Sequence, residues 1–521
     1  MSSVWIKQTL TILGFLVCTA SPIRVSAQTE NNPESFAPKV FPEVFESTWE
    51  SLESTNNHPE WFQDAKLGIY FHWGPYCVPA FQSEWYPRFM HLENPPRWGA
   101  GIKEHHQETY GDPSEFGYHD FFPKFTCEKF DPDEWAELFS VAGAKFAGPV
   151  AQHHDGFSMW ASDVNPNSVI RKGPKRDILG ELFESLRAKD LKTIATFHHS
   201  FTGQRQRDGE PEGRSLSYYP YKPEYFTSSD DPELRKLYGN LTDDEFNDYW
   251  LQLVQEVVGK YSPDIIWFDS WLDVIPDNYV RRMASYHYNA GASRGQEVVL
   301  ACKQDDMPDS TRVLDIEQGG MKGLPDRVWM TDVTLSFKSW SYIEGQTYKP
   351  LPLLVRNMID VWSKRGVVLL NISPRADGVI VQEQRDRLIG LGGWLETYGE
   401  AVYGTRPHVM FGYGEAKIKD GSHGGQAATI KYSASDIRFT RSKDGKTVFV
   451  FLLGQPAAGS QIQIQHLNEG GESGFGIKNV SFLGIDEVCD WKFANGTLTM
   501  PAPKPSPLNE IATVLRVDLV K

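Results

Sequence analysis

The sequence predicts a two-domain α/β protein in which a (β/α)8-type barrel is followed by an all-β sandwich. Up to about residue 405 of the 521, short apolar β-type runs alternate with segments of helical periodicity. Polar residues follow one predicted strand after another, as at the carboxyl-terminal rim of a barrel. Beyond residue 405, Gly-rich turns separate short β-type runs and helical periodicity disappears. We assign residues 40–405 to the barrel and 410–521 to the sandwich.

A doubly wound open sheet is the alternative architecture for the first domain. Such a sheet would be expected to bring a Gly-rich phosphate-binding turn after its first strand, and the sequence has none in that position. The barrel is therefore the preferred prediction.

The composition argues against nucleic acid as a partner. The formal net charge is -16, and no run of Lys and Arg supplies the basic footprint that a phosphate backbone requires. The 16 Trp residues and the 13% aromatic content are high. Flat rings often line carbohydrate clefts, although most of them serve core packing.

The first 27 residues have the pattern of a secretory signal peptide. Lys7 precedes an apolar run over residues 10–20, and Val25-Ser26-Ala27 offers a small-residue cleavage site. We expect a secreted or periplasmic protein that begins near Gln28, without a membrane span after signal removal. An amino-terminal membrane anchor is the alternative, but the apolar run is short for a bilayer. Cys18 lacks the small preceding residue of a lipid-modified cysteine.

The other cysteines are Cys77, Cys127, Cys302 and Cys489. Their wide spacing matches no metal motif. A disulfide is permitted by the expected compartment but is not indicated by the spacing.

The barrel elements follow in order along the chain. Strands are predicted at 67–71, 146–151, 193–197, 265–268, 298–301, 328–330 and 367–372. Helices are predicted to begin after Asp131, around Ile178, after Thr242 and around Gln382. Asp131 and Pro132 form a start signal with an N-cap and a proline at the first helical position, and Thr242 with Glu245 forms a capping box. The carboxy-terminal β-runs are 437–440, 448–453, 462–465 and 512–517.

Polar side chains at several strand ends predict a catalytic hollow. Asp269 follows the apolar run of Ile265 and Ile266, and is the candidate catalytic residue. A lone Asp in this position more often caps a helix. Other predicted strands, however, end at His72, at His153-His154, at His198-His199 and at Trp267. Because several such side chains fall at the same position, at the ends of different strands, an active site is favoured.

Two other chemistries compete with this interpretation. His153, His154 and Asp155 suggest metal ligands, but adjacent residues on an extended chain point to opposite faces and do not easily share one ion. We therefore expect no metal and no cofactor, with one His in the pocket and its neighbour in the wall or at another hydroxyl. A Ser-His-Asp hydrolase would need a Gly-x-Ser-x-Gly elbow after a strand, and the sequence has none there.

Six ordered motifs over about residues 45–405 together resemble the α-L-fucosidases of glycoside hydrolase family 29. They are Lys66-Leu67-Gly68-Ile69-Tyr70-Phe71-His72-Trp73-Gly74, Glu84-Trp85-Tyr86, His153-His154-Asp155-Gly156-Phe157, Gly173-Pro174-Lys175-Arg176-Asp177, Trp267-Phe268-Asp269, and Leu369-Leu370-Asn371-Ile372-Ser373-Pro374 with Asp377-Gly378.

The resemblance implies a retaining exo-hydrolase that removes terminal α-L-fucose from fucosylated glycans. Asp269 matches the family's nucleophile. The residues that match the fucose-binding positions are His72, Glu84, Trp85, His153, His154 and Trp267. His198 or His199 falls where the family often has Tyr, and Lys303 falls roughly where some members have Arg. Gln152 replaces a common Lys and Arg365 a common Gly, so the pocket is expected to depart in detail from the family pattern.

The acid/base residue is expected to be Glu317, which lies at about the family's spacing beyond Asp269. A retaining mechanism needs a second carboxyl about 5 Å from the nucleophile. Asp306 and Asp315 are the competitors for this role. Two alternative functions also stand, a non-catalytic carbohydrate-binding relative and a barrel glycosidase for another sugar such as galactose.

Overall fold

The computed structural model describes residues 36–204, 217–270, 272–303, 305–416, 430–468, 476–486 and 490–520. The predicted signal at 1–27, with Cys18, and the later Cys489 lie outside these residues. The chain divides into a unit of residues 1–37 and a unit of residues 38–521, and the description below concerns the second.

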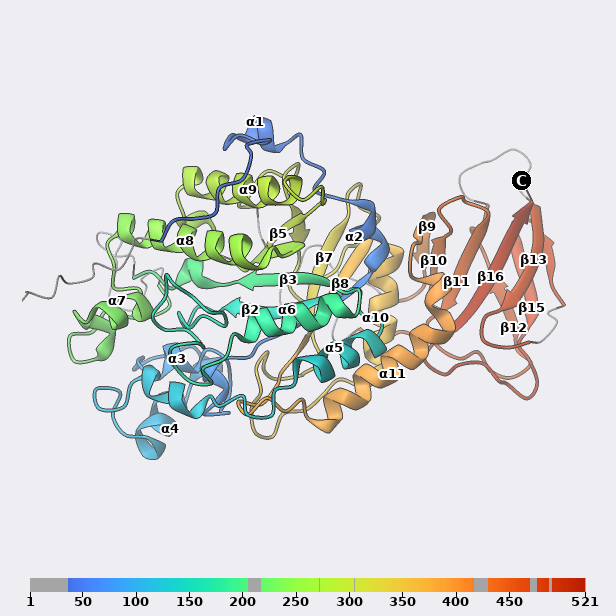
Figure 1. Cartoon of the computed structure of the whole chain (residues 1–521). Coiled ribbons are helices and arrows are strands. Elements are labelled where there is room, and N and C mark those ends of the chain that lie inside the picture. The colour runs from blue at the N-terminus through green and yellow to red at the C-terminus, as the bar shows by residue number, and fades with distance from the viewer. Residues whose placement is uncertain are drawn as a thin grey trace, which may run out of the picture. The chain divides into compact units, whose positions relative to one another are not determined.

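Eight parallel strands close into a barrel in the order of the sequence, and β1 pairs with β8 to complete the ring (Figure 1). The strands are β1 (Leu67–Phe71), β2 (Phe146–Gln152), β3 (Lys192–Phe197), β4 (Ile265–Phe268), β5 (Val299–Lys303), β6 (Val313–Asp315), β7 (Trp329–Thr334) and β8 (Gly366–Ile372). The predicted fold class is confirmed. The sequence pattern missed β6, which has only three residues and carries no periodicity of its own.

Helices lie outside the barrel (Figure 1), and within the described ranges every pair of successive strands is joined by a helix except β5 with β6 and β6 with β7. The long ones are α5 (Pro132–Val141), α6 (Ile178–Ala188), α8 (Asp243–Tyr261), α9 (Asp277–Ala292), α10 (Leu351–Ser363) and α11 (Gln382–Tyr398). Shorter ones are α1 (Trp49–Leu52), α2 (Glu60–Ala65), α3 (Tyr86–Phe89), α4 (Ile102–Thr109) and α7 (Pro232–Tyr238).

Side-chain caps fix where two of the predicted helices begin. The carboxylate of Asp131 accepts from two backbone N–H groups in the first turn of α5. Thr242 and Glu245 form the expected capping box of α8, in which each side chain accepts the other residue's backbone N–H, at 3.3 and 2.9 Å. These reciprocal bonds satisfy donors that the helix itself leaves unpaired.

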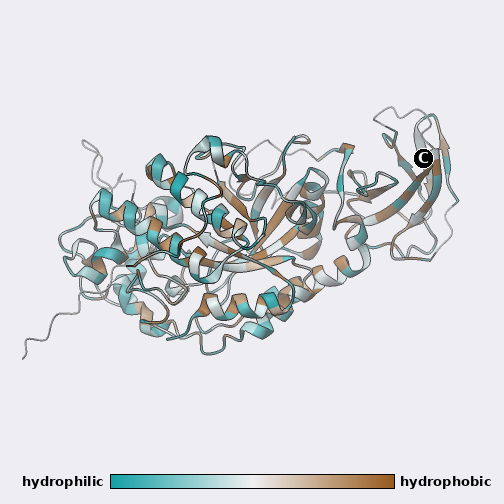
Figure 2. Ribbon diagram, turned by 45° about the horizontal axis from the view of Figure 1, so that its top comes forward, coloured by the Kyte–Doolittle hydropathy of each residue, from teal (hydrophilic) through white to brown (hydrophobic). Residues whose placement is uncertain are grey.

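The strands carry the apolar residues and the helices present polar ones outward, as the colouring of Figure 2 shows. Strands β1, β2, β4 and β8 are buried along their whole length. A parallel strand covered on both faces must be apolar throughout, so the barrel core follows directly from these runs.

The carboxy-terminal strands form two antiparallel sheets on one apolar core. The larger has the order β13-β16-β11-β10-β9 and the smaller β12-β15-β14. The strands are β9 (Arg406–Tyr413), β10 (Ile437–Arg441), β11 (Thr447–Leu452), β12 (Gln461–Ile464), β13 (Gly476–Phe482), β14 (Lys492–Ala494), β15 (Thr497–Pro501) and β16 (Thr513–Val520). Residues from both sheets pack in a single cluster, including Val450, Ile464, Met500 and Leu515. This is the predicted β-sandwich.

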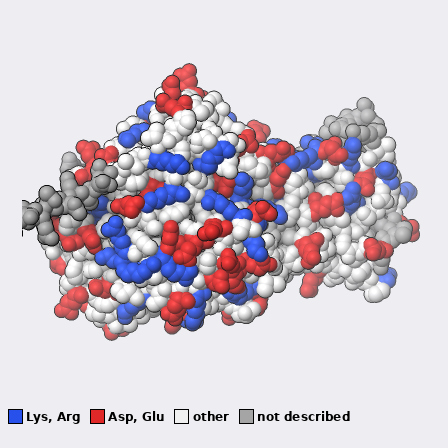
Figure 3. All heavy atoms as spheres, in the orientation of Figure 1, with Lys and Arg blue, Asp and Glu red and all other residues white. Residues whose placement is uncertain are grey.

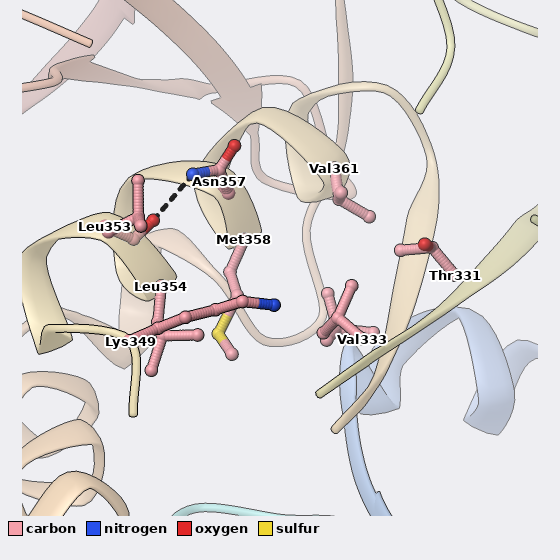
Figure 4. A pocket seen from close by; sticks show the side chains of 9 residues that line it. Thr331, Val333, Lys349, Leu353, Leu354, Asn357, Met358 and Val361 are labelled. Carbon is pink, nitrogen blue, oxygen red and sulfur yellow. Dashed lines mark hydrogen bonds between the residues drawn. The ribbon is translucent and has the colours of Figure 1, made fainter. Parts of the chain in front are cut away.

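A small cavity separates α10 from β7 and β8, and Figure 4 shows Lys349, Met358 and Val333 pointing into it. Its volume is about 20 Å³, which is room for roughly one water molecule. This space is a packing gap and is too small for a sugar.

The described residues have no large basic face in the view of Figure 3, where Lys and Arg intermingle with Asp and Glu. Within the described ranges, no helix combines the length and the apolarity that a membrane crossing needs. Cys77, Cys127 and Cys302 are buried free thiols.

Candidate active site

A cavity of about 380 Å³ opens at the carboxyl ends of the barrel strands. Its volume falls within the range of about 300–1,000 Å³ that is usual for small-molecule sites. Nine of the predicted site residues line it, namely His72, Glu84, Trp85, His153, His154, His198, Asp269, Lys303 and Glu317. They come from the ends of β1 to β6, so the barrel brings together residues that lie more than two hundred positions apart in the sequence.

Asp269 lies at the end of β4 with both carboxylate oxygens in contact with nitrogen atoms. Oδ1 accepts from Lys303 Nζ at 2.7 Å, while Oδ2 lies 3.2 Å from His154 Nε2 and 3.4 Å from His198 Nδ1. Burial opposes ionisation, but the Lys303 ammonium and the two imidazoles hold the pKa of Asp269 well below its usual range. These contacts turn the carboxylate into the cavity, so it does not act as a helix cap.

Lys303 joins the two candidate catalytic carboxylates. Its Nζ is 2.7 Å from Asp269 Oδ1 and 3.1 Å from Glu317 Oε2, which limits these two oxygens to a separation of about 6 Å. Retaining glycosidases have carboxyl pairs about 5–5.5 Å apart, whereas inverting enzymes need a wider gap for water. The arrangement is compatible with the retaining geometry.

A second pair of acids lies beneath Lys303. Asp332 on β7 is 3.4 Å from Lys303 Nζ and accepts from Tyr70 Oη at 2.9 Å. Both carboxyl oxygens of the buried Asp315, and Oδ1 of Asp332, have no hydrogen-bond partner among the described residues. Burial and the neighbouring carboxyl group of Asp332 raise the pKa of Asp315 well above its usual range, which favours its protonated form. Asp315 is buried and does not line the cavity.

The tautomer of His72 is set by Asn371 on β8. The amide nitrogen of Asn371 donates to Thr334 Oγ1 and to the Trp340 carbonyl, so its oxygen faces His72 Nδ1 at 2.8 Å. Nδ1 must then carry the proton and Nε2 presents a lone pair. Burial holds the pKa of His72 well below its usual range, so the ring stays neutral as a hydrogen-bond acceptor.

The tautomer of His198 is also set by a neighbouring acceptor. Its Nδ1 faces the Asp269 carboxylate and must donate, which leaves Nε2 as an acceptor without a partner among the described residues. Burial lowers the pKa of His198 to about 4, despite the opposing attraction of Asp269. Burial likewise holds the pKa of His153 well below its usual range. Neutral acceptor nitrogens suit the binding of sugar hydroxyls.

The two adjacent histidines were expected to lie with one in the pocket and its neighbour in the wall or at another hydroxyl. Both His153 and His154 line the cavity, with ring centroids 4.7 Å apart. The extended conformation of β2 ends at Gln152, so the alternation of side chains between opposite faces ends before His153. Two sets of nitrogen and oxygen atoms lie close enough to hold a metal ion, His72 with His153 and His198, and His154 with His198 and Asp269. Neither set contains both adjacent histidines.

Two predicted residues lie outside the cavity lining. His199 turns away from the hollow, stacks on Trp250 and has its Nε2 3.3 Å from the Trp250 carbonyl. Of the pair left open by the sequence, His198 is therefore the residue in the hollow. Trp267 is fully buried below the hollow. The centroid of its ring is 5.1 Å from Lys303 Nζ, and its ring meets that of His198 edge-on.

Glu84 connects two loops at the rim. Its Oε2 accepts from Ser339 Oγ at 3.0 Å and from the Trp340 backbone N–H at 3.2 Å. Burial raises the pKa of Glu84 above its usual value. Glu84 thereby ties the loop after β1 to the loop after β7.

Several lining residues carried no signal in the sequence analysis. They are Gln82, Ser83, Trp98, Asp332, Lys338 and Trp340. Four of them lie in irregular loops and Trp98 lies in a short 3-10 turn, where neither periodicity nor a motif marks a pocket residue.

The two departures from the family pattern lie away from the hollow. Gln152 is buried at the end of β2 and accepts from Ser158 Oγ at 2.8 Å. Arg365 precedes β8 with a φ of 67°, a left-handed conformation that favours glycine. Asp306, the other competitor for the acid/base role, lines a separate surface hollow beside Asp273.

A closed parallel barrel whose strand ends surround one hollow with four imidazoles and four carboxyl groups, among them the pair Asp269 and Glu317, is the architecture of a barrel glycoside hydrolase. A family model described as alpha-L-fucosidase matches residues 35–400. The chain belongs to this family.

The chain is similar to plasma alpha-L-fucosidase of Homo sapiens, with 28% identity over 462 residues and coverage of 86% of each chain. Tissue alpha-L-fucosidase of Rattus norvegicus is 30% identical over 379 residues, which cover 70% of this chain and 74% of the relative. Among solved structures, the alpha-fucosidase of Thermotoga maritima in complex with fucose has a TM-score of 0.69 and 29% identity, with coverage of 91% of this chain and 100% of that one.

Proposed function

We propose that this protein is a retaining, exo-acting α-L-fucosidase that removes terminal α-L-fucose from glycans by double displacement. The observation that carries the proposal is the contact of one ammonium, Lys303 Nζ, with both Asp269 and Glu317. The names of the similar proteins supply the sugar.

In the first step, Asp269 attacks the anomeric carbon as Glu317 gives a proton to the glycosidic oxygen. The bond from carbon to that oxygen breaks, the leaving group departs as an alcohol, and an ester forms between fucose and Asp269. Lys303 supports this step because it keeps the nucleophile ionised.

In the second step, Glu317 takes a proton from water, which attacks the anomeric carbon and releases fucose. Asp269 loses its charge when the ester forms, and Glu317 gains one at the same moment. Because Lys303 contacts both groups, its ammonium keeps an anionic partner in each state. We infer that this shared counterion couples the two carboxyl groups during the cycle.

The neutral imidazoles of His72, His153 and His198 accept hydrogen bonds from the ring hydroxyls of fucose. The buried rings of Tyr70 and Trp267 close the barrel beneath the site. A hollow closed at its base accepts the end of a glycan and not its interior, which supports exo action.

We further propose that the enzyme acts outside the cytoplasm, after removal of the signal at residues 1–27. The support is the tripartite pattern of those residues. The substrates are fucosylated oligosaccharides or polysaccharides, and the reaction needs no cofactor.

A panel of aryl glycosides tests the proposal. Hydrolysis of the α-L-fucoside is expected, and proton NMR should show α-L-fucose as the first product. If the protein hydrolyses a galactoside but not the fucoside, the assignment of fucose as the substrate sugar is wrong. If β-L-fucose is the first product, the mechanism does not retain the anomeric configuration. A purified, folded protein that binds fucose without turnover would favour the carbohydrate-binding alternative.

A further inference from the structure

The indole of Trp98 stands at the mouth of the active-site cavity. It belongs to the short 3-10 turn Arg97–Gly99 in the chain between β1 and β2, and 54% of its surface is exposed. Trp is enriched at binding surfaces, because its ring offers a large apolar area together with a polar N–H group. The ring nevertheless lines the same hollow as Asp269 and Glu317.

Ring contacts hold Trp98 in place and connect it to the catalytic hollow. It packs edge-on against Phe89 and Trp85, with centroids 4.5 and 5.4 Å apart. Trp85 in turn lies 5.1 Å from His154, which contacts Asp269. A continuous row of rings thus runs from the nucleophile to the mouth. A ring already fixed by packing loses little conformational entropy when a ligand binds.

Two polar side chains line the cavity together with this ring. Gln82 Nε2 donates to the Ala100 carbonyl at 2.7 Å, which orients its amide. Lys338 Nζ donates to the Gly345 carbonyl at 2.6 Å, and an ammonium has two further hydrogens to donate. An apolar plane beside oriented polar groups matches a pyranose, which has an apolar face and a rim of hydroxyls.

We propose that Trp98, with Gln82 and Lys338, forms a leaving-group subsite that binds the sugar to which fucose is attached. The indole stacks on the face of that pyranose, while the amide and the ammonium bind its hydroxyls. The subsite makes the enzyme selective for fucose linked to a saccharide over fucose linked to a small group. This inference rests on the proposed fucosidase function.

The test compares α-L-fucosyl fluoride, which has no leaving-group sugar, with a panel of disaccharides that carry fucose at O2, O3, O4 or O6 of a second pyranose. For each protein, the ratio of kcat/KM for the best disaccharide to kcat/KM for the fluoride is measured. Trp98→Ala should lower this ratio on the order of tenfold, as expected for the loss of one stacking contact. Trp98→Phe should retain most of it, because a ring remains.

Phe337→Ala is the matched control, since Phe337 is similarly exposed, at 51%, and does not line the cavity. Its ratio should equal that of the unaltered protein. An unchanged ratio in folded Trp98→Ala would overturn the subsite and leave the proposed function intact. If the unaltered protein hydrolyses neither the fluoride nor any disaccharide, the fucosidase proposal fails, and the subsite fails with it.

Discussion

At the scale of single residues, the site depends on one buried cation among four acids. Burial opposes the charge of Lys303, yet Asp269, Asp332 and Glu317 around it hold its pKa well above the usual range. The same ammonium keeps the candidate nucleophile ionised. Lys303 therefore favours the charged form of the carboxyl groups that it contacts, and the catalytic roles proposed for Asp269 and Glu317 depend on it.

Substitution of Lys303 tests this control through the pH dependence of activity. The pKa of Asp269 is depressed, so its anion persists to low pH and is lost only when the pH falls through that low value. Lys303→Met should raise this pKa, so the acidic limb of kcat/KM should move to higher pH, with kcat reduced about 10²-fold or more. Lys303→Arg should restore much of the profile. An unmoved acidic limb in Lys303→Met would contradict the role.

Glu317 is distinguished from Asp306 and Asp315 by chemical rescue. Glu317→Ala should lower kcat about 10²- to 10⁴-fold with an unactivated leaving group, because the departing oxygen loses its proton donor. Added azide should restore turnover of an activated aryl fucoside and yield the fucosyl azide. If azide rescues Asp306→Ala but not Glu317→Ala, Asp306 and not Glu317 is the acid/base residue.

The sequence predicted the residues at strand ends better than those in loops. Asp269 and His72 follow apolar runs, so their positions at the rim follow from the strand pattern. Trp340, in the loop after β7, had no comparable signal. The choice between His198 and His199 also required the structure, because it depends on the backbone turn after β3.

At the scale of elements, α10 connects the barrel to the β-sandwich through buried charge. Asp360 on α10 accepts from Lys364 at 2.9 Å and from Arg438 on β10 at 2.5 Å, and all three residues are buried. The Arg356 guanidinium also donates to the carbonyls of Glu510 and Ile511, both at 2.8 Å. One face of α10 thus packs against the barrel, and another contacts the β-sandwich.

Asp360→Asn should lower the free energy of unfolding by about 3–5 kcal/mol, because it leaves two buried cations without their carboxylate. Urea denaturation followed by fluorescence measures the change. The control is Glu233→Gln, which removes a more exposed partner of Lys172 and should cost less than about 1 kcal/mol. Equal losses in the two variants would show that the buried cluster contributes no more than a surface pair.

The sequence predicted helices correctly where the periodic pattern of apolar residues was long or a capping signal marked the start. The helix at Gln382–Tyr398 and the capped start of α8 match the sequence prediction. The three-residue β6 and the helices α9 and α10 were not predicted. Helix α10 begins at Leu351 after Pro350, which has no side-chain hydrogen bond to cap the helix, so no start signal of the kind seen at Asp131 or Thr242 marks it in the sequence.

At the scale of the whole molecule, the barrel and the sandwich are expected to depend on each other. A chain truncated after Gly404 would expose the apolar and charged surface of α10 that β9 and β10 contact. We expect this fragment to aggregate or to unfold without a cooperative transition, as followed by light scattering and calorimetry. A soluble fragment that unfolds near the melting temperature of the full chain would contradict this.

The central claim is that Asp269 is the nucleophile of a fucosyl-transferring site, and covalent labelling tests it most directly. Incubation with 2-fluoro-fucosyl fluoride should add one 2-fluorofucosyl group to the protein, because the fluorine at C2 slows both steps, while the good leaving group, fluoride, keeps formation of the ester faster than its hydrolysis. Peptide mapping by mass spectrometry should locate the group on Asp269, and Asp269→Asn should take up none. A label on any other residue, or an unlabelled protein that still hydrolyses fucosides, would contradict the claim.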